Sequence, residues 1–272
     1  MGARIAIRVD GSHQIGMGHV FRMVNLAEAL RQIGLENIAF CSFADESVGC
    51  WLQQSNFPVE ILGNDAEKRT AITTWLDEYK PDLLINDILD TSIDYMSAIV
   101  GSGCSIINFD DNGPGRKLAD FRINALPCKM LSYGVDSRSY QGPDYLLLGE
   151  EFSLPIPAQV SCKRPGSILV SLGGSDTYGN TLAVVQALHR CKQLNRIHVV
   201  AGPAFGHWSE LMQAVRDDSR FVVDRSVKSM YKLMQENELA VVGGGIMLFE
   251  SARCALPTLS IASEDFERAN IQ

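Results

Sequence analysis

Short runs of apolar residues alternate along the chain with stretches in which apolar residues recur every three to four positions. The helical spacing is clearest at 21–33 and 180–191. Strands that are apolar on both faces and separated by helices are typical of parallel sheets covered on both sides, so we expect an α/β fold. The predicted strands are 4–9, 38–43, 59–62, 82–87, 105–110, 167–172, 197–202, 220–224, 239–243 and 257–262.

The two halves of the chain open alike. The stretches IAIRVDGSHQIGMGH (5–19) and ILVSLGGSDTYGNT (168–181) each read as a strand, a glycine turn and a helix start. A proline-rich, polar stretch at 152–167 predicts a linker. We therefore expect two Rossmann-like domains, 1–155 and 156–272, with parallel sheets facing a central cleft. The final stretch, SEDFERANIQ, reads as a helix start, so a terminal helix is either truncated or absent.

Charge and cysteine content narrow the class of protein. The chain has 24 basic and 32 acidic residues, and a net charge of −8 disfavours nucleic acid and anionic membranes as partners. The seven cysteines include no C-x-x-C pair, and neither a signal-peptide pattern nor a membrane-length apolar run occurs. We expect a cytoplasmic protein without membrane insertion. No metal-ligand spacing is present, so no metal or cofactor is expected, and the oligomeric state stays open.

The first glycine turn does not fit a dinucleotide site. Gly16 and Gly18 form G-x-G, but Phe21 stands where the third glycine belongs, which disfavours NAD. The turn and the helix start still favour an anion or a developing negative charge. His19 lies in the first turn of that helix, where the dipole favours a neutral imidazole that accepts a proton. The alternative is a histidine that only hydrogen-bonds a neighbouring loop.

Charged residues gather at the ends of the first-half strands. Arg8 and Asp10 share one face of an otherwise apolar strand, and later strands end in Asp87 and in Asp110–Asp111. The carboxyl ends of parallel strands meet at one edge, so these groups should converge near His19. These charged residues could bind substrate and assist a base, or they could form a structural ion-pair network. The two roles are compatible, because a charged network that orients a base also supports it.

The second half offers a nucleotide site. Gly173, Gly174 and Ser175 follow a strand and could cradle a diphosphate, although a plain turn would look the same. Gly244 and Gly245 precede a helix carrying Glu250. A carboxylate there can accept two ribose hydroxyl hydrogens, although a solvated helix residue is the simpler interpretation.

The motifs together resemble a known family. The sequence resembles the UDP-sugar hydrolase family of pseudaminic-acid biosynthesis, within the GT-B superfamily. Four stretches carry the resemblance: RVDGSHQIGMGHVFRMVNLA (8–27), INFDDN, SLGGSDTYGNT and VVGGGIMLFESARCALPTLSIASEDFERANIQ. The resemblance covers nearly the whole chain. Its most specific positions are Arg8, Asp10, Ser12, Gly16, Gly18, His19 and Arg22.

The resemblance implies a metal-independent hydrolysis with inversion, in which His19 is the base, with Asp10 beside it, and UDP leaves. It also implies substrate contacts by Asn270 and Gln272, although Ile271 lies between them. Asp87 is followed by Ile88 and Leu89 where the family has Asp-His-Tyr, so the exact sugar is open. A GT-B glycosyltransferase and a non-catalytic nucleotide-sugar-binding protein remain the rivals. The implied binding residues are Arg8, Gly16, Gly18, Arg22, Asp87, Asp111, Gly173, Gly174, Ser175, Gly244, Gly245, Glu250, Asn270 and Gln272.

Overall fold

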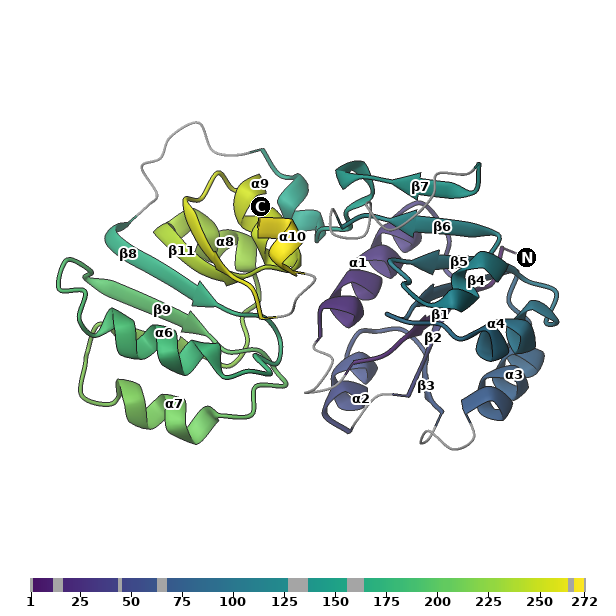
Figure 1. The fold of residues 1–272 in the computed structure, drawn as a ribbon, viewed down its shortest axis with the longest axis horizontal. Helices are drawn as coiled ribbons and strands as arrows, with labels where there is room; N and C mark the ends of the chain where they lie inside the picture. The colour runs from purple at the N-terminus through teal and green to yellow at the C-terminus, as the bar shows by residue number, and fades with distance from the viewer. Residues whose placement is uncertain are drawn as a thin grey trace. The chain divides into compact units, whose positions relative to one another are not determined.

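The structure is a computed structural model that describes residues 2–11, 17–43, 46–62, 68–126, 137–155, 164–263 and 267–271. The chain forms two compact units. The first comprises Met1–Gly11 and His19–Leu147, and the second comprises Leu148–Gln272 together with Ser12–Gly18. Each unit is built on one sheet of parallel strands with helices packed against it (Figure 1). The predicted α/β class with two parallel sheets is therefore confirmed.

The sheet of the first unit has the strand order β3-β2-β1-β4-β5-β6-β7. The first five strands in sequence fall within the predicted runs, whereas β6 and β7 were not predicted. These last two strands of the sheet, of which β7 is the edge strand, are short and mix polar with half-exposed aromatic residues, so they lack an apolar run. The strands are β1 Ile5–Val9, β2 Ile38–Ser42, β3 Val59–Ile61, β4 Leu83–Asp87, β5 Ser105–Phe109, β6 Phe121–Asn124 and β7 Ser139–Gln141.

Helices pack on both faces of this sheet. Helices α3 (Lys68–Tyr79) and α4 (Ile93–Val100) bury Leu76 and Met96 against Leu84 and Ile106. Helix α1 (Gly18–Gln32) lies on the opposite face, and α2 (Glu46–Gln53) follows β2. Short 3₁₀ turns follow in the described residues, namely η2 Pro114–Leu118, η3 Pro143–Tyr145 and η4 Glu150–Ser153.

The second unit has a five-stranded sheet in the order β10-β9-β8-β11-β12. One face packs on α6 (Asn180–Leu188) and α7 (Trp208–Val215), and the other on α8 (Met230–Glu236) and α9 (Ile246–Arg253). The short helix α10 spans Glu267–Ile271. The strands are β8 Arg164–Ser171, β9 Arg196–Val200, β10 Phe221–Asp224, β11 Asn237–Gly243 and β12 Thr258–Ile261.

The strand orders define where each unit would bind a ligand. The order reverses between β1 and β4 in the first sheet and between β8 and β11 in the second. In open α/β sheets, ligands bind outside the carboxyl ends of the strands at such reversal points. The turns β1–α1, β8–α6 and β11–α9 all leave the sheets there. Among the described helices, none has the length and apolar character needed to cross a membrane.

Candidate active site

His19 and Asp87 form the centre of the site in the first unit. His19 is the second residue of α1 and Asp87 the last of β4, and their Nδ1 and Oδ1 atoms lie 2.6 Å apart. Burial opposes ionisation of Asp87, but the charges of Arg22 and His19 outweigh burial and hold the pKa of Asp87 at about 2. An ionised carboxylate can only accept, so Nδ1 of His19 is the donor in this contact, and Nε2 is the ring nitrogen left to accept a proton.

Arg22 ties this pair to the neighbouring strand. It is one turn along α1 from His19 and is only 1% exposed. Its Nε and Nη2 donate to Asp87 at 2.8 and 2.5 Å, its Nη1 donates to Asp110, and the guanidinium lies over the Phe109 ring. Burial opposes the charge of Arg22, yet the two carboxylates raise its pKa. A buried arginine with two carboxylates is a rigid support for the Asp87 carboxylate.

Asp110 anchors the far end of the network. Its backbone has φ of 42°, which is uncommon outside glycine and turns its side chain inward. The second carboxylate oxygen accepts hydrogen bonds from the Ala125 and Leu126 amides at 2.9 and 3.3 Å. The contacts of Asp110 therefore join α1 to the end of β6. Asp110 was seen at a strand end in the sequence, but its pairing with Arg22 was not predicted.

Arg8 and Asp10 form a separate ion pair. Both Nη atoms of Arg8 donate to the Asp10 carboxylate at 2.6 Å, and Oδ1 of Asp10 also accepts from the Phe43 amide at 2.8 Å. His19 instead directs its Nδ1 at Asp87. The structure thus brings Arg8 and Asp10 together, as their shared face predicted, and places Asp87 rather than Asp10 against His19.

Asp111 holds a loop. Its carboxylate accepts from the Thr91 amide and hydroxyl, the Gly113 amide and the Asn108 side chain. Burial raises its pKa in spite of these hydrogen bonds. Of the two remaining predicted residues of this region, Gly18 begins α1, and Gly16 lies outside the described residues.

In the second unit, the β8–α6 turn is closed on itself. Gly173 has φ of 99°, and Gly174 lies so near Gly202 that a side chain on Gly202 would strike its backbone. The Asp176 carboxylate accepts from the amides of Asn180 and Thr181 at 3.0 and 2.7 Å. Those first amides of α6 are the donors that a phosphate would use, so the helix start is already capped by an anion. The hydroxyl of Ser175, also predicted here, lies 3.1 Å from that of Thr177.

The β11–α9 turn has a different character. Gly245 is the N-cap of α9 and provides no side-chain cap. A side chain on Gly244 would come within 2.7 Å of the Glu267 side chain, and Asn270 donates to the Gly244 carbonyl at 2.9 Å. The predicted residues Gly244, Gly245 and Asn270 are therefore brought together, while Gln272 lies outside the described residues.

Glu250 lies on the fifth position of α9 and is half-buried. Burial, with a smaller effect from the nearby Glu151 carboxylate, raises the pKa of Glu250 to about 7. Among the described residues, no hydrogen bond reaches the Glu250 carboxylate, whereas Glu151 accepts from Ser229 and the Tyr231 amide. Glu250 thus offers acceptor oxygens to a ligand.

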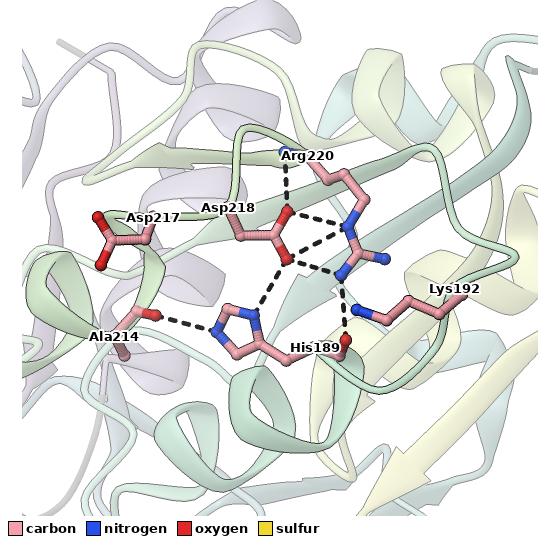
Figure 2. A pocket seen from close by; sticks show the side chains of 6 residues that line it. All are labelled: His189, Lys192, Ala214, Asp217, Asp218 and Arg220. Carbon is pink, nitrogen blue, oxygen red and sulfur yellow. Dashed lines mark hydrogen bonds and ion pairs between the residues drawn. The ribbon is translucent and has the colours of Figure 1, made fainter.

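A cavity of about 400 Å³ lies at the opposite edge of the second sheet, where α6 and α7 end and β10 begins (Figure 2). His189 and Arg220 both point at Asp218. Arg220 also donates to the carbonyls of His189, Cys191 and Leu194, and His189 contacts the Ala214 carbonyl. The side chains of His189, Asp218 and Arg220 therefore bind one another and the backbone between α6 and β9, and we call these three residues the clamp. Within the described residues, no group of histidine, cysteine and acidic side chains could hold a metal ion.

Comparison with known proteins gives two relatives at 28% identity. No protein-family model matches the chain. An uncharacterized protein of Methanocaldococcus jannaschii, MJ1062, and the spore coat polysaccharide biosynthesis protein SpsG of Bacillus subtilis each align with 97% of the chain. The chain spans only 57% of the length of the first and 79% of the second.

Solved structures define the fold. MurG of Acinetobacter baumannii has a TM-score of 0.63 at 14% identity, with 98% of this chain and 82% of that one covered. HepE of Anabaena, solved in complex with UDP-glucose, has a TM-score of 0.61 at 15% identity, with 99% and 88% covered. The chain therefore has the GT-B-like fold that its sequence predicted.

Proposed function

We propose that this protein hydrolyses a UDP-activated diacetamido-trideoxy sugar at its anomeric carbon, giving free sugar and UDP on the way to a nonulosonic acid such as pseudaminic acid. The contact of His19 Nδ1 with the ionised Asp87 carries this proposal, because it leaves Nε2 as the base. The sequence motif, the SpsG relative and the UDP-glucose bound to HepE support a nucleotide-sugar substrate.

The nucleotide would be held by the second unit. Glu250 would accept hydrogen bonds from the ribose hydroxyls, since no described residue donates to it. The diphosphate would lie at the first turn of α9, whose N-cap Gly245 supplies no side-chain cap. We assign the diphosphate there rather than to the α6 start, because Asp176 already occupies the α6 amides and would repel a second anion.

The sugar would be cleaved by the first unit. Nε2 of His19 takes one proton from water, and the water oxygen bonds to the anomeric carbon. The bond from that carbon to the β-phosphate oxygen breaks, and UDP leaves with the electron pair. Attack from the face opposite UDP inverts the configuration. Donors at the α9 start stabilise the charge that develops on UDP, and the histidine contributes about 10²–10⁴ in rate.

A glycosyltransferase of the same fold is the second candidate, because the same His19 would take the proton of an acceptor hydroxyl. The similarity to MurG and HepE favours it as much as hydrolysis. A non-catalytic nucleotide-sugar-binding protein is the third, since the Arg22 network could be purely structural.

The deciding experiment measures UDP release from a panel of UDP-sugars with no acceptor present. Release that disappears in His19→Asn supports hydrolysis. Release that needs an added acceptor supports transfer, and calorimetric binding without release supports the binding protein. The matched control is Arg220→Met, which alters the clamp of Figure 2 and leaves His19 untouched.

A further inference from the structure

Two side-chain amides at the ends of β6 and β7 have buried donors without partners. Nδ2 of Asn124 and Nε2 of Gln141 are both buried and make no hydrogen bond within the part of the chain that the structure describes. Asn124 is 3% exposed, whereas Gln141 is half-buried. A buried donor without an acceptor costs about 1–3 kcal/mol, so two in one place call for an explanation.

The two amides lie side by side. Asn124 and Gln141 are register partners on adjacent parallel strands, so their side chains leave the same face of the sheet. Neighbouring strands are about 4.8 Å apart, which brings two long amides within reach of one atom. A carbonyl oxygen has two lone pairs and no hydrogen, and it matches two converging N–H donors better than a hydroxyl does.

The pair is attached to the frame that holds His19. The Asp110 amide donates to the Ile123 carbonyl at 2.8 Å, and Asp110 accepts from Ala125 and Leu126, on either side of Asn124. Asp110 is bound to Arg22, and Arg22 to Asp87. β6 is two strands from β4 in the sheet, or about 10 Å, and Asp87 and Asn124 are the last residues of these two strands, at the same carboxyl edge.

We propose that Asn124 and Gln141 form a subsite for a neutral carbonyl oxygen on the sugar, such as that of an acylamino group. This inference rests on the proposed function and adds two specificity-determining residues to it. A neutral donor pair suits a neutral acceptor, because an unpaired charge at this buried position would be costly.

The test compares UDP, UDP-glucose and UDP-N-acetylglucosamine by calorimetry on the full chain. The wild type should prefer the N-acetyl sugar to UDP-glucose. Asn124→Leu and Gln141→Leu should each reduce that preference about 3- to 10-fold, the value of one hydrogen bond, and should leave UDP affinity unchanged. Melting temperature should hold or rise, since each variant removes an unsatisfied donor. Tyr140→Phe, on the other face of β7, is the matched control.

Two results would overturn the subsite. One is UDP binding with no N-acetyl preference in the wild type. The other is an N-acetyl preference that survives in folded Gln141→Leu, the less buried of the two positions, while both leucine variants melt at a lower temperature than the wild type. The amides would then stabilise the fold and would not bind the sugar. Failure of the wild type to bind any of the three ligands would instead refute the proposed function, and with it the subsite.

Discussion

Nδ1 of His19 lies 2.6 Å from Oδ1 of Asp87, although the two residues are 68 positions apart in the sequence. The contact exists because β4 is inserted beside β1, which brings the end of β4 under the first turn of α1. The carboxylate sets which ring nitrogen carries the proton, as in other histidine bases held by an acid.

Replacing Asp87 with Asn should impair both turnover and folding. The substituted amide no longer fixes the Nδ1 proton of His19, so we expect turnover to fall at least about 10²-fold. Arg22 loses one of its two carboxylates while staying buried, which should lower the free energy of unfolding by about 3–5 kcal/mol. Asp120→Asn is the control, because Asp120 accepts from the Ile106 amide at the amino end of β5, the opposite edge of the sheet from the end of β4. Equal turnover loss in both variants at temperatures where both are folded would contradict a specific role for Asp87.

Asp87 should also make the protein sensitive to acid. Its pKa is lowered from an ordinary 3.8 to about 2, so the ionised form stabilises the folded state. That contribution, about 2 kcal/mol, is complete above pH 4 and is lost as the pH falls from 4 toward 2. Denaturant unfolding at pH 5, 4 and 3 should show the loss in the wild type and a flatter profile in Asp87→Asn. Parallel profiles would show that Asp87 is not the group responsible.

Glu250 should have the opposite dependence on pH. Its pKa is raised from 4.5 to about 7, so the folded state keeps a proton that the unfolded chain has lost. Stability therefore falls as the pH rises from 4.5 through 7, by up to about 2 kcal/mol for a partly exposed group. Glu250→Gln should remove this slope and melt higher than the wild type at pH 8.

The same residue tests the nucleotide site. Glu250→Ala should weaken UDP binding by about 1.5–3 kcal/mol for each hydrogen bond lost to the ribose. Calorimetry with uridine separates the ribose contact from the phosphates, because uridine carries no charge near neutral pH. Unchanged uridine affinity in the folded variant would remove Glu250 from the site.

The clamp in Figure 2 should affect stability alone. Arg220 donates to Asp218 and to three backbone carbonyls between α6 and β9. Arg220→Met leaves those carbonyls without their donor, so we expect a lower melting temperature with unchanged UDP affinity. A loss of UDP affinity in this variant, measured well below its melting temperature, would mean that the cavity does more than support the fold.

The sequence could predict the sheets and part of the site. Apolar runs gave the central strands, because a parallel strand buried on both faces needs an unbroken apolar stretch. The pairing of Arg8 with Asp10 followed from their shared face. Strands β6 and β7 were missed because Arg122, Asn124 and Gln141 break the apolar pattern.

The partners of His19 could not be predicted in the same way. The sequence placed Asp87 at a strand end, but which strand lies beside β1 depends on the order of the whole sheet. Four acidic residues were therefore equally suited to contact His19. The residues before α6 favoured a helix cap from Ser175, Asp176 or Thr177, and Asp176 provides it. The sequence could not decide whether the Gly-Gly-Ser-Asp stretch also cradles a phosphate, because the same residues fit both kinds of turn.

His19 itself provides the most direct test of the proposed chemistry. His19→Asn keeps a polar side chain of similar reach, able to stay near Asp87, but removes the basic nitrogen. If Nε2 takes the proton from water, turnover should fall by about 10²–10⁴ while UDP affinity changes little, because the nucleotide is assigned to the second unit. Turnover, UDP affinity and melting temperature should be measured on one preparation. A histidine that merely supports the loop predicts a lower melting temperature and near-normal turnover of the folded fraction, and that result would exclude His19 as the base while leaving the fold unaffected.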